Sequence, residues 1–373
     1  MVKMDEIKIV KYQESDYSKF SDFARVAFHS KYILSDEKFL DWQYLSPGSA
    51  LLLAKKGSPT TSLGTKHEEI IGFFGYKDFP YKIYGETKNA RVIMNLFVAE
   101  KYRMAGVGPK LVEAVFDTEN YILSSSLNEA SRKLYWHYRP SFKEVGDLNR
   151  YMAVLGGHKL MEGFNYREIA SQEPRNDNRN YSNVRLPRPE DGTRNDINFT
   201  SLEKADARFD NFWARVRGRY LATIERYSEY LNWRFFKHPI FEYKSIVAEK
   251  GGSVYGFLFW RMEEVDDFKI ARIIDFVAEE SSEASLLREF LERAKEAGAY
   301  AADFMFSGDF YKNSLEAVGF FDTKGTDFDK FPIRFNPLSY SKFVINIAYD
   351  IPAPLADCYL TKADSDQDRP NPH

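Results

Sequence analysis

The sequence predicts two tandem copies of one mixed α/β domain. Four short stretches recur in the same order, each about 180 to 195 residues later. The recurring pairs are "FLDWQYL" and "YLNWRFF", "LLLAKKG" and "SIVAEKG", "IGFFGYK" and "YGFLFWR", and "LFVAE" and "DFVAE". An ordered recurrence of this kind is the signature of an internal repeat. The length of 373 residues is about that of two ordinary domains, which agrees with a duplication.

Each copy shows the same expected order of elements. A helical segment with the Leu-x-Trp pair precedes a strand, a polar turn and a second strand around Gly-Phe. A longer strand ends in Val-Ala-Glu, and an amphipathic helix follows it. A short strand, a second helix and closing strands complete the copy, with "RYMAVL" closing the first and "KFVINIAY" the second. A strand meander followed by alternating strands and helices predicts a mixed α/β (α+β) sheet.

The expected domain boundaries follow from the composition. Residues 1–160 form the first copy, residues 161–199 a linker or crossover, and residues 200–373 the second copy. The segment 168–199 is rich in Asn, Arg, Asp and Pro and has no apolar period. The tail 362–373 is also polar, and its "DSDQD" resembles the start of a calcium loop. Because the glycine at the sixth loop position is missing, a solvated tail is the expectation, although the tail could fold back over an acceptor site.

Charge and cysteine content exclude several classes of protein. A net charge of −3 gives no reason to expect a basic nucleic-acid-binding face. The single cysteine, Cys358, excludes an intramolecular disulfide framework and a cysteine-based zinc site, and no metal is expected. No stretch reaches about 18 consecutive apolar residues, so no membrane span is expected. We therefore expect a cytoplasmic protein, while its oligomeric state stays open.

The stretch "YRMAGVGPK" at residues 102–110 is a candidate anion site. It places Arg103, Gly106 and Gly108 between an apolar strand and an amphipathic helix. Glycines allow close approach of the backbone, and the helix N-terminus favours negative charge, so a pyrophosphate would fit. A plain strand-to-helix turn is the alternative. Pro109 lacks an N–H group, which narrows the set of donors without removing the site.

This stretch resembles the Gly-rich motif of the GNAT superfamily of acyl-CoA-dependent N-acetyltransferases. Downstream, "NEASRKLYWHYRPSF" resembles the next motif of that family, with Asn128 and Tyr135 seven residues apart. The resemblance covers most of residues 1–155 and is concentrated in residues 92–142. It implies an acyl-CoA N-acyltransferase fold in two tandem copies, with acetyl-CoA as cosubstrate. The "YLNWRFFKHPIFEY" segment further resembles a tandem group found near bacterial surface-polysaccharide genes.

The resemblance also implies roles for individual residues of the first copy. The strand around Leu96, Phe97 and Val98 would pair with the pantetheine arm, and Asn128 would meet its side. Tyr135 would donate a proton to the departing CoA thiolate. The remaining cofactor-binding residues would form the pyrophosphate cradle, and they are Arg103, Met104, Ala105, Gly106, Val107 and Gly108.

The general base stays open at this point. The strand carries Asn95 where a carboxylate could have stood, and an amide cannot act as a base. His29, His67 and His137 are candidates only by residue type, and a water relay is an equal alternative.

The second copy has lost the anion site. After "DFVAE" it reads "ESSEASLLREF", with no glycine pair, and Glu280 or Glu283 would repel a phosphate. We therefore expect it to form one wall of the acceptor site. Trp42 and Trp233 occupy equivalent repeat positions, which favours packing roles for both. Between Tyr220 and Tyr243, aromatic residues alternate with basic ones, which we interpret as a helical core with solvated charges rather than a nucleic-acid surface.

The expected function is direct transfer of an acetyl or short acyl group from acyl-CoA to an amine of a small acceptor. The resemblance points to an amino sugar or a sugar nucleotide. Two alternatives remain: a Fem-type transferase that uses aminoacyl-tRNA, and a non-catalytic protein that binds CoA and a partner.

Overall fold

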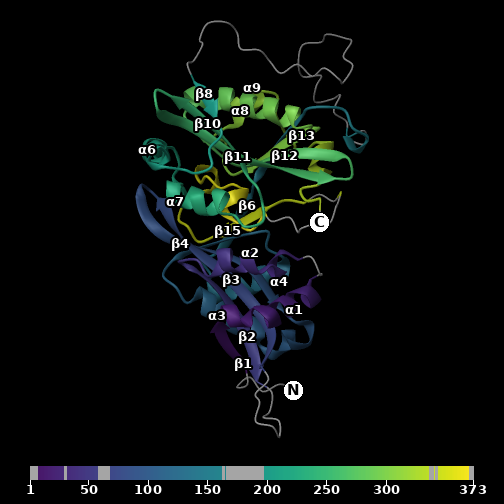
Figure 1. The fold of residues 1–373 in the computed structure, drawn as a ribbon. Coiled ribbons are helices and arrows are strands. Elements are labelled where there is room, and N and C mark those ends of the chain that lie inside the picture. The colour runs from purple at the N-terminus through teal and green to yellow at the C-terminus, as the bar shows by residue number, and fades with distance from the viewer. Residues whose placement is uncertain are drawn as a thin grey trace.

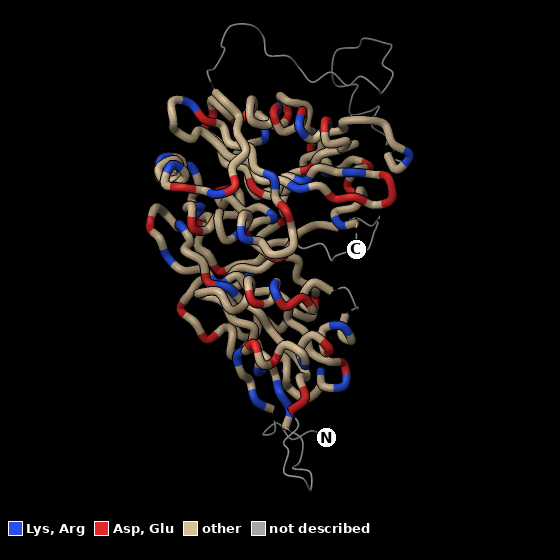
Figure 2. Tube along the Cα trace, in the orientation of Figure 1, with Lys and Arg blue, Asp and Glu red and all other residues tan. Residues whose placement is uncertain are grey.

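The computed structural model describes residues 7–28, 32–57, 68–161, 164, 197–335, 340 and 343–368. His29, His67 and most of the expected linker lie outside these residues. The chain forms two β-sheets that lie one above the other, with the C-terminal segment between them (Figure 1). Lys and Arg alternate with Asp and Glu along both halves (Figure 2). Among the described helices, none is both long and apolar enough to cross a membrane.

The first sheet has the strand order β1-β2-β3-β4-β5-β15-β6, and β9 pairs with an end of β3. All pairs in it are antiparallel except β4 with β5. Its strands are β1 (Ile7–Lys11), β2 (Ser49–Gly57), β3 (Glu68–Ile83), β4 (Glu86–Val98), β5 (Tyr121–Ser125), β15 (Asn346–Tyr349), β6 (Lys143–Asp147) and β9 (Ala222–Ile224).

The second sheet repeats this order of seven strands, without a counterpart of β9 among the described residues. Its order is β8-β10-β11-β12-β13-β7-β14, and the pair of β12 with β13 is again the parallel one. The expected mixed-sheet fold in two copies is therefore confirmed. Its strands are β8 (Asn198–Thr200), β10 (Lys244–Lys250), β11 (Ser253–Val265), β12 (Phe268–Ala278), β13 (Ala301–Phe306), β7 (Asn149–Val154) and β14 (Phe321–Asp322).

Helices cover both faces of each sheet, and the repeated Gly-Phe pair explains how. In β3, Phe73 packs on Phe20 of α1 at 5.2 Å between ring centroids. The neighbouring Gly72 faces α3, where a Cβ atom would lie 3.3 Å from Val107. Since adjacent strand residues point to opposite faces, α1 and α3 lie on opposite sides of the sheet. The helices are α1 (Tyr17–Ala27), α2 (Glu37–Tyr44), α3 (Val107–Phe116), α4 (Glu129–Tyr138), α6 (Ala207–Val216), α7 (Ser228–Leu231), α8 (Glu280–Glu296) and α9 (Lys312–Ala317).

The second copy uses the same two positions in the same way. Phe257 packs on Phe212 of α6, with ring centroids 5.8 Å apart. Its neighbour Gly256 faces α8, and a Cβ atom there would lie 3.1 Å from Leu286. The Gly-Phe pair thus lets one helix approach the sheet closely while the aromatic ring anchors the helix on the other face.

The two sheets exchange their closing strands, which the sequence did not predict. β7, from the first half of the chain, lies between β13 and β14 of the second sheet. β15, from the second half, lies between β5 and β6 of the first. Arg150 of β7 explains this placement in part, because its guanidinium binds the buried carboxylate of Asp303 in β13 at 2.8 Å. The boundaries at 160 and 199 stay a prediction, and both sheets take strands from across them.

Two tryptophans from the repeated stretch join the copies. The rings of Trp42 and Trp233 stack with centroids 4.6 Å apart and planes 8° apart. Each indole also donates to the other residue's carbonyl, Trp42 at 2.9 Å and Trp233 at 3.4 Å. The expected packing role of both residues is confirmed, and it is reciprocal, because the two copies meet through equivalent positions.

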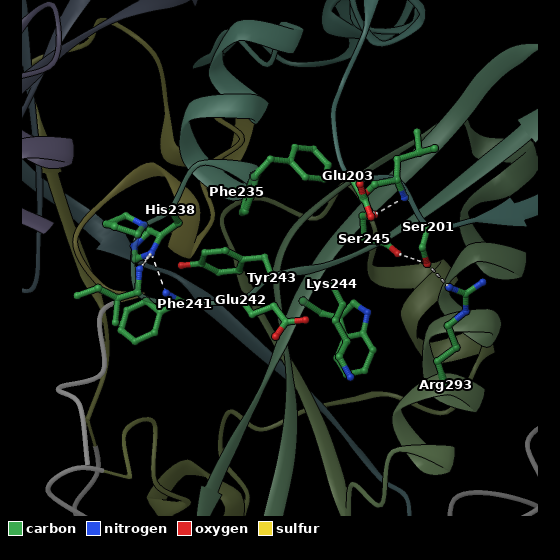
Figure 3. Close-up of a pocket in the computed structure, with 15 residues that line it drawn as sticks. Ser201, Glu203, Phe235, His238, Phe241, Glu242, Tyr243, Lys244, Ser245 and Arg293 are labelled. Carbon is green, nitrogen blue, oxygen red and sulfur yellow. Dashed lines mark hydrogen bonds between the residues drawn. The ribbon is translucent and has the colours of Figure 1, made fainter. Parts of the chain in front are cut away.

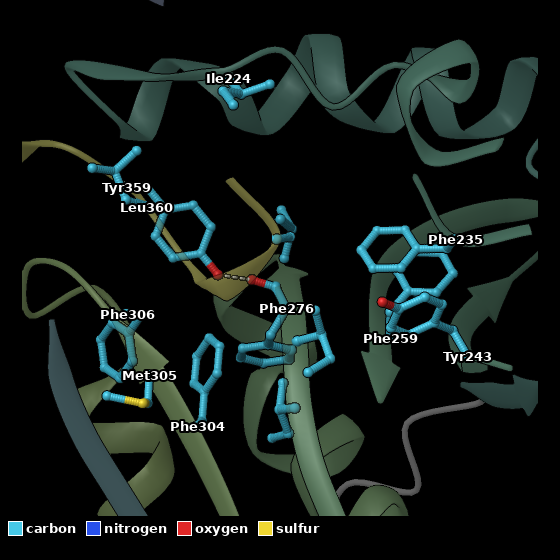
Figure 4. Packing of buried hydrophobic residues seen from close by; sticks show 14 of the residues in the cluster. Ile224, Phe235, Tyr243, Phe259, Phe276, Phe304, Met305, Phe306, Tyr359 and Leu360 are labelled. Atoms are coloured by element: carbon cyan, nitrogen blue, oxygen red, sulfur yellow. Dashed lines mark hydrogen bonds between the residues drawn. The ribbon is translucent and has the colours of Figure 1, made fainter. Parts of the chain in front are cut away.

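Aromatic rings fill much of the second copy's core (Figure 4). Phe235 stacks on Phe259 with centroids 4.0 Å apart and planes 3° apart. Tyr359, from the C-terminal segment, packs with this core and donates its hydroxyl to the carbonyl of Phe276. The C-terminal segment is therefore part of the core.

The expectation of a solvated tail is wrong for residues 362–368. Lys362, Asp364 and Asp368 are all buried, with at most 2% of their surface exposed. Asp368 binds Arg261 at 2.8 Å and Arg234 at 3.1 Å. A buried charge is tolerated only when it is paired, and these arginines supply the pairs.

The two carboxylates belong to a larger network in the second copy. Five arginines and five carboxylates pair there, each at least nine-tenths buried. They are Arg150, Arg226, Arg234, Arg261, Arg272, Glu263, Asp275, Asp303, Asp364 and Asp368. The charges between the aromatic residues 220–243 are therefore not solvated as expected, because Arg226 and Arg234 pair with the C-terminal segment.

The strand exchange predicts that neither half of the chain folds alone. A fragment 1–180 would lack β15 between β5 and β6, and β7 would lose both of its partners. We expect each separate fragment, 1–180 or 181–373, to lack a cooperative melting transition by circular dichroism. The mixed fragments should form a one-to-one complex in size-exclusion chromatography. A folded, monomeric fragment 1–180 would contradict this prediction.

Replacing Asp368 with Asn should destabilise the protein by about 3–5 kcal/mol, because two buried guanidiniums lose their shared charge. Asp357→Asn, at an exposed carboxylate, should change the free energy of unfolding by less than about 0.5 kcal/mol. Denaturant titration measures both. Burial alone would raise the pKa of Asp368, but Arg261 and Arg234 outweigh it and lower that pKa.

The sign of the pH dependence follows from this lowered pKa. The stability that Asp368 contributes is full above its unfolded pKa of about 3.9 and is lost as the pH falls through the lower folded value. The difference between wild type and Asp368→Asn should therefore be constant from pH 5 to 8 and shrink under acid conditions. A difference that grows on acidification would contradict this assignment.

Candidate active site

Strand β4 carries a bulge that sets the geometry of the candidate site. Asn95 has a φ of +62°, and two residues of β4 oppose Phe74 alone in β3. Asn95 donates to the hydroxyl of Tyr44 at 2.8 Å. A Cβ atom at Gly75 would lie 2.6 Å from the same Tyr44, so only glycine allows that ring to reach the bulge. The bulge is therefore fixed by a side chain of α2, and it was not predicted from the sequence.

Beyond the bulge, β4 separates from its parallel neighbour. Pairing with β5 ends at Val92 and Leu123, whereas β4 continues to Val98. In the described part of the chain, no strand pairs with the β5-facing side of Leu96, Phe97 and Val98. Such an open strand edge can pair with an extended amide-bearing ligand in the manner of an added strand.

The Gly-rich stretch lies at the end of this open edge. It forms a 3-10 turn from Glu100 to Ala105, and α3 begins at Val107. Gly106 joins the two with a φ of +73°, a conformation that favours glycine. The first N–H groups of a helix have no acceptor within the helix, so the turn presents donors together with the positive end of the helix dipole.

Gly108 lies in the first turn of α3 and is buried. Its φ is not positive, and a Cβ atom there would lie 3.6 Å from Leu134, an ordinary contact. The protein's own packing therefore does not require glycine at this position. Arg103 and Met104 are exposed, and Met104 is 99% exposed, so both side chains stand at the rim of the turn. Arg103 donates to the Val98 carbonyl at 3.3 Å, which places its guanidinium beside the open strand edge.

Asn128 and Tyr135 both lie on α4, next to α3. Asn128 is the N-cap of α4, and its Oδ1 accepts from the N–H of Ser131 at 2.9 Å. This helix cap accounts for an asparagine at position 128 without any ligand. A contact with pantetheine would then be made by the side-chain amide nitrogen. Tyr135 is 3% exposed and stacks on Phe74, the residue opposite the bulge, at 5.7 Å.

Burial raises the pKa of the Tyr135 phenol far above its usual value, although a hydrogen bond with Ser131 opposes this. The phenol therefore stays protonated at neutral pH and can donate a hydrogen bond. The same shift makes complete proton loss unfavourable, so the environment suits stabilisation of a thiolate better than full proton transfer to it.

In the second copy, internal side chains fill the position that corresponds to the Gly-rich turn. Glu283 in the first turn of α8 is 3% exposed and pairs with Arg219. It also accepts from the hydroxyl of Ser314 at 2.5 Å. Glu279, the N-cap residue of α8, binds Arg215 at 3.0 Å. Of the two carboxylates expected here, Glu283 is thus neutralised by an internal arginine, while Glu280 is exposed. The second copy's expected inability to bind acyl-CoA stays a prediction.

A narrow inner cavity of about 20 Å³ lies on the opposite face of β4 from α3. Gln43, Val92 and Met94 of the first copy line one side of it. Trp233 and His238 of the second copy and residues 363–365 of the C-terminal segment line the rest. Its volume is enough for a single water-sized group. The cavity therefore joins the bulge of β4 to both copies and to the C-terminal segment.

A larger, more open cavity of about 700 Å³ lies beyond His238, which lines both cavities. Figure 3 shows His238, Phe241 and Tyr243 toward one end and Ser201, Glu203 and Arg293 toward the other. The imidazole Nδ1 of His238 accepts from the N–H of Phe241 at 3.0 Å, which fixes the ring between the two cavities. This outer cavity thus combines aromatic faces with acidic and basic groups.

Sequence reasoning found the Gly-rich turn but missed the acidic group of the inner cavity. Among the three histidines that it considered, only His137 lies in the described residues, where it is exposed on α4. The group that it missed is Asp364, from the polar tail. The excess of arginines among the apolar residues 220–272 was the available signal, because buried arginines need carboxylates from elsewhere in the chain. Among the described residues, no group of three or more His, Cys, Asp or Glu is placed to hold a metal ion.

No model of a known protein family and no curated protein sequence matches this chain. Many solved structures resemble the fold of this chain. A conserved protein of unknown function from Enterococcus faecalis V583, described as a probable N-acyltransferase, matches with a TM-score of 0.57 and 9% identity, over 92% of this chain and 71% of that one. A GCN5-related N-acetyltransferase from Kribbella flavida matches with a TM-score of 0.54 and 14% identity, over 94% and 73%.

The third structure is the N-myristoyltransferase of Saccharomyces cerevisiae with bound myristoyl-CoA and inhibitors. It matches with a TM-score of 0.53 and 10% identity, over 98% of this chain and 87% of that one. Identities this low establish the fold alone. Together with the two mixed sheets, these matches show that the chain has the fold of the GNAT-type acyl-CoA N-acyltransferases.

Proposed function

We propose that this protein transfers an acyl group from acyl-CoA to an amine, with the chemistry in the first copy. One observation carries the proposal: the open edge of β4 leads directly into a glycine turn at a helix N-terminus. This combination offers an extended arm a strand to pair with and a pyrophosphate a set of donors, and it occurs where the resemblance to the GNAT superfamily places both. Acyl-CoA has both of these parts in that order.

The bulge in β4 leaves backbone groups available for the proposed transfer. Because β4 is open beyond Asn95, backbone N–H groups near Leu96 are available to polarise a thioester carbonyl. The amine attacks that carbonyl, the new C–N bond forms, and the C–S bond breaks. The Tyr135 hydroxyl, next to the bulge through Phe74, would stabilise the departing thiolate with a hydrogen bond, and the proton that the sulfur gains would come from the attacking nitrogen.

The acceptor would enter between the two copies. The inner cavity has room for an amino group only, which favours a primary amine and an acetyl or short acyl donor. The outer cavity has the aromatic faces and carboxylates that bind sugars and other polar ring compounds. An amino sugar or sugar nucleotide is therefore the acceptor class that we propose to screen first.

Replacing Gly108 with Asp should abolish binding of acetyl-CoA, while Gly108→Asn is the matched neutral control. Either side chain has room for its Cβ atom, and an acidic residue in the first turn favours the helix. Two like charges 4 Å apart repel by about 4 kcal/mol at an effective dielectric constant of 20. We therefore expect the Asp variant to bind at least about 30-fold more weakly than the Asn variant by calorimetry. Equal affinities would mean that no phosphate lies at this turn.

Replacing Tyr135 with Phe should lower kcat by about 100-fold and leave acetyl-CoA binding unchanged. The ring and its stacking on Phe74 are retained, so the fold should be kept. The measurement is the release of free CoA from acetyl-CoA with a panel of amines, and Tyr138→Phe on the same helix is the control. Turnover that is unaffected in the Tyr135 variant would remove this residue from the mechanism. CoA binding without turnover in the wild type would favour the non-catalytic alternative.

A further inference from the structure

The inner cavity contains a carboxylate oxygen that the protein leaves without a hydrogen bond. Asp364 lines this cavity and is 2% exposed. Its Oδ2 accepts from Arg226 at 2.8 Å and from the N–H of Thr361 at 2.6 Å. No described residue donates to its Oδ1, which is buried. A buried carboxylate oxygen is expected to have a partner, so its absence needs an explanation.

The cavity that Asp364 lines adjoins strand β4 near its bulge. Met94 of β4 lines it too, two residues before Leu96 in the chain. A group in the cavity is therefore beside the open part of β4, on the face opposite α3. The cavity volume of about 20 Å³ matches one amino group and excludes a branched one.

Aromatic rings line the cavity wall beside Asp364. Trp233, Trp42 and His238 are among the lining residues, and Arg234 is the cationic one. The ring of Trp233 is already engaged, because it stacks on Trp42 and lies 4.4 Å from the ammonium of Lys77. The carboxylate of Asp364 is therefore the group of this cavity that can bind a primary ammonium.

We infer that Asp364 is the catalytic residue that binds the acceptor's ammonium group and takes a proton from it. This inference rests on the proposed function. In the reaction, the ammonium loses one proton to Asp364 and becomes a nucleophile. After the C–N bond forms and the C–S bond breaks, the nitrogen's second proton ends on the CoA sulfur. Asp364 releases its proton to solvent, and the products are an amide and free CoA.

The electrostatic surroundings agree with this role. Burial raises the pKa of Asp364 to about 6, Asp275 adds to the rise, and Arg226 opposes it. A base with a pKa near neutrality accepts a proton more readily than an ordinary aspartate. Besides Arg226 and Asp275, the titratable or charged groups near the Asp364 carboxylate are Tyr81, Tyr230, Arg234, His238 and Lys362.

The variant that tests this inference is Asp364→Asn, and Asp275→Asn is its matched control. Both remove one of the two carboxylates that bind Arg226, at 2.8 and 2.9 Å, and both positions are buried. Asp275 is not among the residues that line the inner cavity. A purely structural role of Asp364 would therefore be shared by the two variants, whereas a role toward the amine would not. Circular dichroism and thermal melting verify that each variant folds.

The first measurement uses ethylamine hydrochloride as the probe, titrated into the full chain saturated with CoA. We expect the wild type and Asp275→Asn to bind ethylammonium with similar affinity. Binding to Asp364→Asn should be at least tenfold weaker. In the wild type, affinity should fall as the pH is lowered through about 6, because protonation of Asp364 removes the negative charge. Asp275→Asn should show such a fall too, since it keeps Asp364, whereas Asp364→Asn should not. Equal binding to both variants, or no binding to the wild type at 100 mM probe, overturns the inference.

The second measurement separates this inference from the proposed function. CoA release from acetyl-CoA with ethylamine should fall about 100-fold in Asp364→Asn. The loss should be smaller with methoxyamine, whose nitrogen is already neutral at pH 7 and needs no base. An equal loss with both amines overturns the base role. Ethylammonium binding that depends on Asp364, without CoA release by any amine, overturns the proposed transfer and retains the amine site.

Discussion

The exchange of closing strands is the constraint on which the rest of the structure depends. The second sheet takes β7 from the first half of the chain, and the first sheet takes β15 and β9 from the second half, so the two copies cannot separate without breaking both sheets. The same arrangement brings Trp42 and Trp233 into their reciprocal stack and gives the inner cavity walls from both copies. A site that requires walls from both copies needs such a connection, because an ordinary interface between domains permits relative motion.

The buried ion pairs of the second copy also fix how parts of the chain lie relative to one another. Replacing a buried ion pair with apolar residues is often neutral or stabilising, so the network is not explained by stability alone. Its effect is to specify a position: Asp364 of the C-terminal segment binds Arg226, and Asp368 of the same segment binds both Arg234 and Arg261. The network thus places residues 363–365 against β4 of the first copy, and the cavity wall follows from that placement.

The fold was predictable from the sequence because its signals are local and repeated. The Gly-Phe pair and the Leu-x-Trp pair recur with their spacing intact, and both prove to be packing devices in the structure. The Gly-rich turn was also local, since a strand, two glycines and a helix lie within about 20 residues. The exchange of β7 and β15 was not predictable in this way, because a strand's own pattern of apolar residues does not state which sheet it joins.

The missed part of the site has a common physical cause. Arg226, Arg234 and the C-terminal acidic residues each look solvated when read alone, since charged residues are rarely buried. Their burial depends on partners more than 100 residues away in the chain. The Tyr44 contact that fixes the β4 bulge is likewise distant, at 51 residues from Asn95. Long-range pairing of polar groups leaves no periodic trace in the sequence, whereas apolar packing does.

In the function that we propose, duplication lets one chain hold both the chemistry and the acceptor. The first copy keeps a turn open to an anion, and the second fills the equivalent place with Arg219 and Glu283. A second cofactor site would bring nothing to a reaction with one donor, but a rigid second sheet gives the acceptor a wall that the first copy lacks. The second copy also contains the arginines that pair with the buried C-terminal segment. In the proposed function, the first copy would therefore bind the acyl donor, and the second copy would hold the buried carboxylate beside β4 that binds the acceptor.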